Sequence, residues 1–332
     1  MRPRAALPPI AVVAALAAIP SGAAAQQPPA PSPTPAPSQQ PAPAPGLHIV
    51  TERVGGARAT ILVRTRFRVR VIVKPYLPGQ QVTVSFVRNG RAVHTVTATV
   101  RQGKTAGQVL VGYAPRATGQ LTIQATHPAT PQLGALAAAP ATVNVLPRRA
   151  APGSSGRAVR VLQARLRALG YVVGARGKYD DRTGRAVLAF RKVVGMARTT
   201  VADENVFRAL ARGQGAFHVR KASHGRHVEA DLSRQVIALI GAGGKVERIY
   251  PTSSGKPSTP TVLGTFRVYT KSPGTNAKGM FDSSYFVRGY AIHGYPDVPV
   301  FAASHGCLRV PIPDAPTIFA WIQIGTIVDV YS

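Results

Sequence analysis

The segment GYAIHGYPDVPVFAASHGCLRVP, residues 289–311, contains the only cysteine of the 332-residue chain. Residues 290–292 have the composition of the end of a β-strand, and His293 follows them directly. Ten residues, 294–303, then lead to a Ser-His-Gly turn immediately before Cys307. We expect the loop to return the chain so that His293 and Cys307 lie close together.

The N-terminus indicates that the chain is exported. Residues 1–25 place Arg2 and Arg4 before an apolar run that ends in three alanines, which is the pattern of a cleaved signal peptide. Residues 26–46 alternate proline with small residues and are predicted to be an extended linker. No later segment is apolar enough to span a membrane, so we expect no stable span after cleavage and a location in the cell wall, the periplasm or the medium.

A single cysteine in an exported protein favours a reactive thiol or an intermolecular partner, because extracellular cysteines usually pair within the chain. A buried, inert thiol is the alternative for Cys307. The residues around Cys307 favour the reactive thiol, because they supply the groups that acyl transfer needs.

The positive charge is concentrated in the N-terminal two thirds of the chain. The net charge is +29, and residues 216–332 hold 12 Lys and Arg against 7 Asp and Glu, so +5 lies there and +24 lies in residues 1–215. Zinc-finger spacing, an RNA-binding aromatic motif and a basic zipper are all missing from the sequence, so nucleic acid is not an expected partner. Anionic cell-wall polymers are the expected partner, although an arginine-rich proteome would give the same charge.

Residues 47–147 have the pattern of a β-domain. Phe67, Val69 and Val71 alternate with arginines, as in a half-buried strand, and Asn89-Gly90 predicts a tight hairpin. About 100 residues of this kind predict an immunoglobulin-like β-sandwich that acts as a spacer or docking module.

Residues 152–214 are predicted to form three short helices. Val159, Leu162, Leu166 and Leu169 share one helical face and Gly170 marks its end; a second helix is predicted over residues 183–194 and a third after Asp203. The stretches VRVLQARLRALGY and GKYDDRTGRAVLAFRKVVGM resemble the peptidoglycan-binding-like domain. The departure is residues 177–181, GKYDD, where that family more often has an aspartate-glycine pair before the aromatic residue.

Residues 216–332 return to a β pattern. Residues 236–240, VIALI, are apolar on both faces and predict a central strand. His218, His224 and His227 lie in a basic segment without nearby thiolates, and only Glu229 and Asp231 are close in sequence. We therefore expect solvated loop histidines here, and we expect neither a metal nor a cofactor.

The segment around Cys307 supplies the parts of a cysteine acyltransferase. Cys307 is the candidate nucleophile and His293 the candidate base; His305 competes for that role because it lies two residues from the thiol. Gly306 permits a sharp turn, so the amides of Gly306 and Cys307 could bind a developing oxyanion, with Ser304 and His305 supporting the turn.

Arg309 and Tyr290 are the candidate substrate-binding residues. The fixed cation of Arg309 is suited to a substrate carboxylate or to a backbone carbonyl that shapes the pocket, and a purely structural role is equally open. Tyr290 lies at the start of the segment that carries His293.

The order of His-Gly, SHGC and Arg, preceded by STPTVLGTF, closely resembles the L,D-transpeptidase catalytic domain of the YkuD type over about residues 216–332. The resemblance implies a β-sandwich-like fold with the cysteine on an edge loop. It implies cleavage of a peptidoglycan stem between its third residue and a terminal D-alanine, with the stem held as a thioester and passed to an amine of a neighbouring stem in a 3-3 type cross-link. It also implies that Gly294 orients His293 through its carbonyl, and that carbapenem-type β-lactams act as covalent inhibitors.

Two departures from the family and three alternative functions stand beside this interpretation. The ten-residue loop before Ser304 is shorter than in many members, and Arg309 stands where some have asparagine.

Sortases also use His, Cys and Arg, but their histidine lies much further upstream and they lack the SHGC turn. An L,D-carboxypeptidase with the same site and a non-catalytic wall-binding protein remain open. A fragment that begins near Ala216 is expected to keep activity on soluble stems and to bind wall material less.

Overall fold

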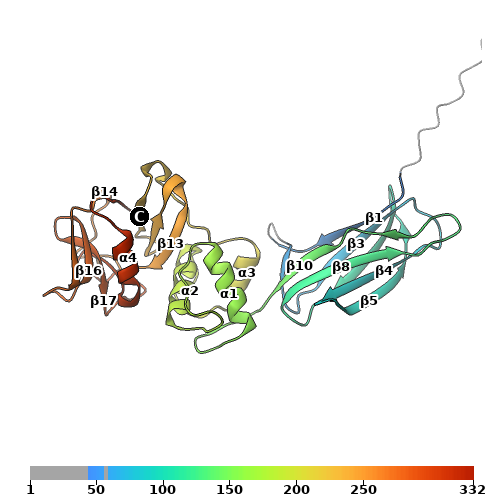
Figure 1. The fold of residues 1–332 in the computed structure, drawn as a ribbon, viewed down its shortest axis with the longest axis horizontal. Coiled ribbons are helices and arrows are strands. Elements are labelled where there is room, and N and C mark those ends of the chain that lie inside the picture. Colours follow the sequence, from blue (N-terminus) through green and yellow to red (C-terminus); the bar gives the residue numbers. More distant parts are fainter. Residues whose placement is uncertain (1–43, 56–58) are drawn as a thin grey trace, which may run out of the picture. The chain divides into compact units, whose positions relative to one another are not determined.

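The computed structural model describes residues 44–55 and 59–332 of the chain (Figure 1). The predicted signal peptide and most of the predicted linker lie outside these residues. Within the described ranges, no helix is both long and apolar enough to cross a membrane. The described part is mainly β, with one helical region between two β regions, as the sequence predicted.

The first β region is a two-sheet sandwich. Phe67, Val69 and Val71 are buried in one core with residues of the facing sheet, as their alternation with arginine predicted. Asn89 and Gly90 have φ angles of 50° and 76°, which is the left-handed geometry of the predicted hairpin. One sheet has the order β1 (Gly46–Glu52), β3 (Phe67–Lys74), β7 (Gly107–Tyr113), β6 (Arg101–Gln102); the other has β2 (Thr60–Leu62), β10 (Ala141–Leu146), β8 (Gly119–His127), β4 (Gln81–Arg88), β5 (Arg91–Thr99), with β9 (Leu136–Ala137) paired to β8.

The helical region contains the three predicted helices, α1 (Arg157–Ala168), α2 (Asp181–Val193) and α3 (Glu204–Ala211). Asp180 and Asp203 cap the second and third helices by accepting hydrogen bonds from the amides of Thr183 and Val206. Gly170 follows the first helix with a φ of 92°, a conformation that favours glycine and ends the helix there.

The second β region contains two sheets, one α-helix, α4 (Ala315–Trp321), and three short 3-10 helices, η1 (Ala222–His224), η2 (Ala242–Gly244) and η3 (Ile312–Asp314). The sheet next to the three helices has the order β13 (Val246–Pro251), β12 (Val236–Ile240), β11 (His227–Asp231), β19 (Ile327–Tyr331), β14 (Gly264–Arg267). The other sheet has the order β15 (Thr270–Thr275), β16 (Phe281–Val287), β17 (Tyr290–Tyr295), β18 (Leu308–Pro311).

Strand β12 is an inner strand of its sheet and is fully buried, and its two faces belong to two different hydrophobic cores. Val236, Ala238 and Ile240 pack with the buried residues of the three helices. Ile237 and Leu239 pack with the residues of the second β region. The helical region and the second β region therefore share one strand as the wall between their cores.

Polar contacts reinforce this boundary. The Lys192 amine on α2 donates to the carbonyl oxygens of Gln235 and Thr252 at 3.0 and 2.9 Å. Arg182 and Arg185 form ion pairs with Asp314, which is only 2% exposed, at 3.1 and 2.7 Å. Burial of Lys192, with a smaller effect of the Arg198 charge, lowers the pKa of its amine to about 7.

The histidines near the start of the second β region differ from the prediction. His218 is exposed, but His227 is completely buried in β11, with Nε2 3.2 Å from Glu229 Oε1. His224 Nδ1 lies 2.9 Å from Asp329 Oδ2. The prediction of solvated loop histidines is therefore wrong for His227, because the paired carboxylate satisfies its polar atoms inside the sheet. Among the residues described, no group of three or more His, Cys, Asp or Glu has a metal-binding arrangement.

Candidate active site

Parallel pairing of β17 with β18 brings the two halves of the site together. His293 stands opposite Arg309 in this register, and Ile292 stands opposite Leu308, the residue after Cys307. The sequence suggested that His293 follows the end of a strand, but it lies inside β17. The reason is that the pairing with β18 extends the strand through Gly294 and Tyr295.

The turn before the cysteine depends on glycine. Gly306 has a φ of 114°, and a Cβ atom there would overlap the ring of Tyr290. The Ser304 hydroxyl donates to the Cys307 carbonyl at 2.6 Å and accepts from the Gly306 amide at 3.1 Å, so Ser304 supports the turn as predicted. His305 is exposed and does not support the turn; its Nε2 lies 3.4 Å from the Lys256 amine.

This hydrogen bonding changes the expected oxyanion site. The Gly306 amide already donates to Ser304, so it is committed to the turn. The prediction that the amides of Gly306 and Cys307 act as a pair is wrong for Gly306 in this conformation, which leaves the Cys307 amide as the candidate donor of the turn.

His293 is held as a neutral base. Its Nδ1 lies 2.9 Å from the Gly294 carbonyl oxygen, and because a carbonyl only accepts, Nδ1 carries the proton and Nε2 has the free lone pair. Burial lowers the pKa of His293, the Arg309 charge lowers it further, and the Gly294 carbonyl opposes the shift. The orienting role expected for Gly294 matches this geometry.

Burial also disfavours the thiolate form of Cys307. Its sulfur lies 3.8 Å from the Gly289 carbonyl oxygen, a weak contact. Burial raises the pKa of Cys307, and the Ala291 amide and the charges of Arg309 and Lys278 only partly offset the effect. The structure thus gives no support to a resting thiolate-imidazolium pair, because desolvation disfavours both charged forms.

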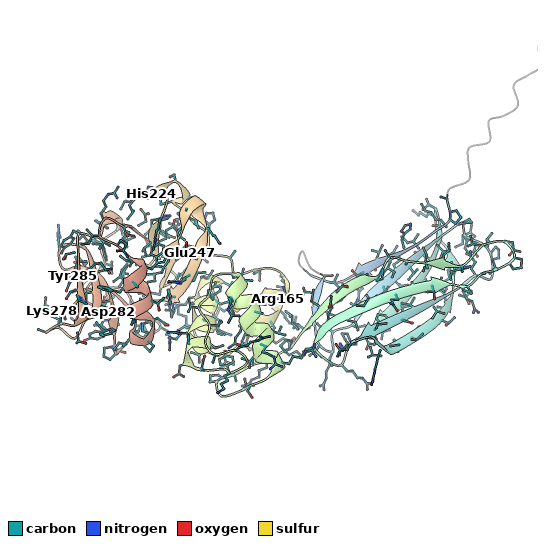
Figure 2. The ribbon with its side chains drawn as sticks, viewed as in Figure 1. Arg165, His224, Glu247, Lys278, Asp282 and Tyr285 are labelled. Atoms are coloured by element: carbon teal, nitrogen blue, oxygen red, sulfur yellow. The ribbon has the colours of Figure 1, made fainter. Side chains whose placement is uncertain are left out.

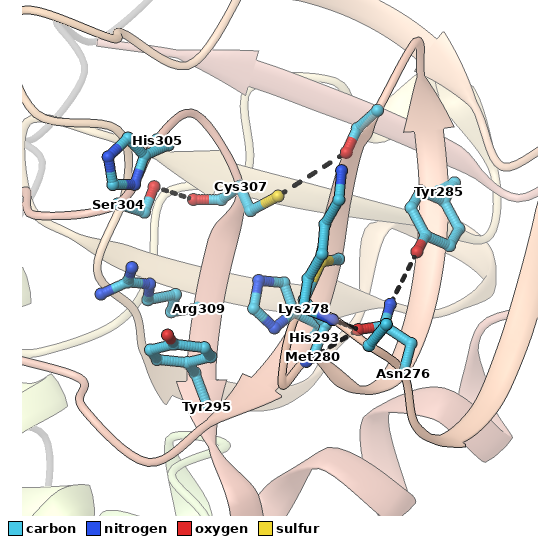
Figure 3. A pocket seen from close by; sticks show the side chains of 12 residues that line it. Asn276, Lys278, Met280, Tyr285, His293, Tyr295, Ser304, His305, Cys307 and Arg309 are labelled. Atoms are coloured by element: carbon cyan, nitrogen blue, oxygen red, sulfur yellow. Dashed lines mark hydrogen bonds between the residues drawn. The ribbon is translucent and has the colours of Figure 1, made fainter.

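Cys307 borders a cavity of about 510 Å³ (Figure 3). The sulfur points toward the side of the cavity that holds His293 and Lys278, and the His305 ring points away from it. The lining residues are Asn276, Ala277, Lys278, Met280, Tyr285, Gly289, His293, Tyr295, Ser304, His305, Cys307 and Arg309. The geometry favours His293 over His305 as the base.

Two family models match regions of this chain. The L,D-transpeptidase catalytic domain model matches residues 225–330, and the peptidoglycan binding domain model matches residues 155–210. A crystal structure of the L,D-transpeptidase from Xylanimonas cellulosilytica is 34% identical, with a TM-score of 0.52, and the match covers 56% of this chain and 98% of that one. The chain belongs to the L,D-transpeptidase family.

A second L,D-transpeptidase structure, from Stackebrandtia nassauensis, is 20% identical and covers 55% of this chain and 95% of that one, with a TM-score of 0.36. No curated protein matches the chain.

Within the L,D-transpeptidase domain, the two predicted substrate-binding residues have different positions. Arg309 lines the cavity; its guanidinium stacks on the Tyr295 ring at 4.1 Å and lies 3.8 Å from Asp297 Oδ2. Tyr290 is not a lining residue, because its ring packs against the turn at Gly306. In this conformation the Tyr290 ring packs against the turn and does not line the cavity.

Sequence reasoning missed the part of the L,D-transpeptidase cavity that comes from the β15–β16 hairpin. Asn276, Lys278, Met280 and Tyr285 line it, 22 or more residues before Cys307. The only local signal was the Asn-Ala-Lys-Gly stretch at 276–279, which is typical of a turn and says nothing about what the turn faces.

Proposed function

We propose that this chain is a cell-wall L,D-transpeptidase that forms 3-3 type cross-links through a thioester on Cys307. The observation that carries the proposal is the arrangement of Cys307 and His293 on one cavity, with the His293 Nδ1 proton held by the Gly294 carbonyl so that Nε2 is free to accept the thiol proton.

The first half-reaction releases D-alanine. His293 Nε2 takes the proton of Cys307 as the sulfur attacks the carbonyl carbon of the third stem residue. The amide of Cys307 donates to the resulting oxyanion. As the intermediate collapses, the carbon-nitrogen bond breaks and the imidazolium returns its proton to the leaving amine, leaving a thioester and neutral His293.

The second half-reaction transfers the stem. An amine of a neighbouring stem attacks the thioester carbonyl, His293 accepts the amine proton, and the carbon-sulfur bond breaks. The same proton then returns to the thiolate, so the enzyme ends as it began. Water in place of the amine gives the L,D-carboxypeptidase reaction, which uses the same groups.

The other regions support an exported, wall-bound enzyme. The match of residues 155–210 to a peptidoglycan binding domain and the charge of +24 on residues 1–215 support binding to peptidoglycan and to anionic wall polymers. The signal-like residues 1–25 support export. Carbapenem-type β-lactams are the expected acylating inhibitors of Cys307.

The decisive experiment gives the full chain a disaccharide-tetrapeptide and identifies the products by mass spectrometry. We expect a cross-linked dimer and free D-alanine from the wild type, and neither from a folded Cys307→Ala variant. A trimmed monomer without dimer would assign the carboxypeptidase reaction instead. Dimer formation by Cys307→Ala would contradict the proposal.

A further inference from the structure

The cavity beside Cys307 carries two cations and no carboxylate. Lys278 and Arg309 line it, and the list of lining residues contains neither aspartate nor glutamate. Arg309 is 12% exposed, and its nearest carboxylate, Asp297, lies at 3.8 Å with a side chain 75% exposed, so the pair is weak. The Lys278 amine has no hydrogen bond or ion pair with any residue that the structure describes. The cavity is therefore an unneutralised cationic site.

A tight turn holds Lys278 in place. The side-chain oxygen of Asn276 accepts hydrogen bonds from the amides of Lys278 and Met280 at 2.9 and 3.0 Å. The amide of Gly279 donates to the Asn276 carbonyl at 2.9 Å, and the Asn276 side-chain amide donates to the Tyr285 hydroxyl at 3.1 Å. The turn thus fixes the backbone of Lys278 at the cavity edge, and the free side chain keeps its three donors for a ligand.

The two cations lie on different sides of the thiol. Figure 3 shows Lys278 on the side to which the sulfur points and Arg309 on the opposite side, next to Tyr295. Both charges act on the sulfur, since each lowers the pKa of Cys307 against the larger effect of burial. A scissile carbonyl that reaches the sulfur therefore has one positive charge on either side in this view.

We propose that Lys278 and Arg309 bind an acyl donor with two free carboxylates, one on each side of the scissile carbonyl. One is the carboxylate of the leaving D-amino acid, and the other lies on the side chain of the third stem residue. In this arrangement Lys278 favours stems in which the side chain of the third residue ends in a carboxylate. Stems in which the same side chain ends in a carboxamide react more slowly. The inference rests on the proposed acyl transfer and specifies its donor.

The test compares two tetrapeptides that differ only in a carboxylate or a carboxamide on the third side chain. The full chain is mixed with each peptide without an acceptor, so that the rate of thioester formation, followed by mass spectrometry, reports on the donor alone. We expect the wild type to prefer the carboxylate peptide by about 10- to 100-fold, the usual range for one charge-assisted hydrogen bond. The preference should weaken as salt rises.

Variants of Lys278 test whether this residue recognises the side-chain carboxylate of the third stem residue. In Lys278→Gln the ratio of the two rates should fall toward one, Lys278→Arg should keep most of the preference, and Lys278→Glu should invert it. Lys245→Gln is the matched control, because Lys245 is exposed and lies in the turn before β13, and it should keep the wild-type ratio.

The outcomes separate this inference from the proposed function. Equal rates for the two peptides in the wild type, or an unchanged preference in Lys278→Gln, would overturn the role of Lys278 while leaving thioester formation established. Failure of either peptide to form a thioester with any of the proteins would overturn the acyl transfer and this inference with it.

Discussion

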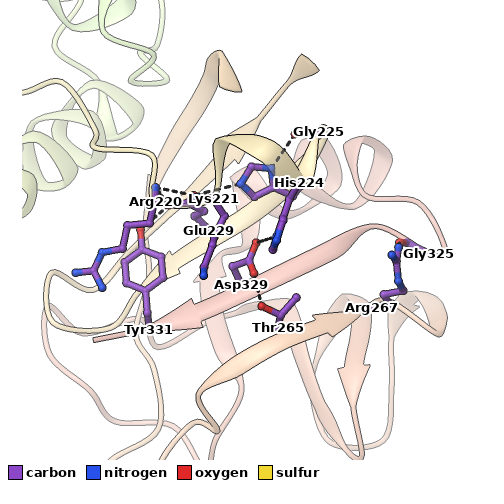
Figure 4. A network of polar contacts seen from close by, with 11 residues as sticks. Arg220, Lys221, His224, Gly225, Glu229, Thr265, Arg267, Gly325, Asp329 and Tyr331 are labelled. Atoms are coloured by element: carbon purple, nitrogen blue, oxygen red, sulfur yellow. Dashed lines mark hydrogen bonds and ion pairs between the residues drawn. The ribbon is translucent and has the colours of Figure 1, made fainter. Parts of the chain in front are cut away.

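Two polar regions of the L,D-transpeptidase domain each contain a buried histidine, but they differ in how their charges are paired. In the region of β11 and β19, Glu229 accepts from the amides of Arg220 and Lys221 at 2.9 and 2.7 Å and from the Tyr331 hydroxyl at 2.6 Å (Figure 4). Around Cys307, the cations have weak partners or none. Figure 2 places His224 of the first region and Lys278 of the second in separate parts of the domain.

The difference shows how a structural polar cluster can be told from a reactive one. Where every buried donor and acceptor is paired, the network stabilises the fold and has nothing left for a ligand. Where cations, a neutral base and a thiol face an open cavity without counter-charges, the missing partner is supplied by the substrate. Substitutions around Cys307 should therefore reduce activity, and those around Glu229 should reduce stability.

The largest expected effect is the loss of activity in His293→Ala, which should far exceed the loss in His305→Ala. His293→Ala should lower kcat/KM by about 10²–10⁴-fold, because it removes the general base, while His305→Ala should cost less than about tenfold, since the His305 ring is exposed and points away from the sulfur. Dimer formation followed by mass spectrometry measures both. Equal losses in the two variants would remove the distinction between them.

The thiol itself offers a second test. Because burial raises the pKa of Cys307 above its ordinary value of 9.0, the thiolate is scarce at neutral pH and its population grows only as pH rises past that value. The rate of iodoacetamide labelling should inflect above pH 9, and His293→Ala should leave the inflection nearly unchanged. An inflection well below pH 8 that moves upward in His293→Ala would establish a resting ion pair instead.

The substitution Glu229→Gln tests the role of the hydrogen-bond network around Glu229. Burial raises the pKa of Glu229, but hydrogen bonds from Tyr331, Arg220 and Lys221 more than offset this, so its folded pKa lies below the ordinary 4.5. Its stabilisation is therefore fully present above pH 4.5 and is lost as pH falls through the folded pKa.

We expect Glu229→Gln to lower the free energy of unfolding by about 1–3 kcal/mol at pH 7. The difference in unfolding free energy between the wild type and the variant should become smaller below pH 4.5. The value of kcat/KM should change by less than about twofold. Thermal melts across pH measure the first quantity and cross-linking assays the second. A large loss of activity in a stable variant would give this network a functional role.

The smallest effect on activity is expected at Lys192, which lies between the helices and the sheet and does not line the cavity of Cys307. Its pKa of about 7 in the folded chain lies below the ordinary 10.5, so the unfolded chain binds more protons between these values and stability rises with pH there. Lys192→Met should flatten that rise, by at most about 1.4 kcal/mol per pH unit, the value for one proton. Melting temperatures from pH 7 to 10 for both proteins check this, and parallel curves would show that Lys192 stays charged.

The sequence was most informative where local pattern decides the structure. The alternation at Phe67, the Asn89-Gly90 hairpin and the buried strand at residues 236–240 follow from period and turn chemistry. The SHGC turn likewise pointed to Cys307, and the short separation of His293 placed it nearby.

Non-local pairing decided what the sequence could not predict. Only the register of β17 with β18 shows that His293 lies within a strand, and only the β15–β16 hairpin brings Lys278 to the cavity. The burial that keeps the thiol and the imidazole neutral, and the ring of Tyr290 under Gly306, also depend on tertiary packing.

The shared strand β12 has a consequence for how the protein unfolds. Removing residues before Ala216 would strip the helices from Val236, Ala238 and Ile240 and expose that apolar face to water. We therefore expect the fragment that begins near Ala216 to be less stable than the full chain, because its β12 strand would lose one of its two packed faces. A calorimetric scan should show the helices and the catalytic sheets melting in a single transition, and the smallest autonomous enzyme should begin before α1.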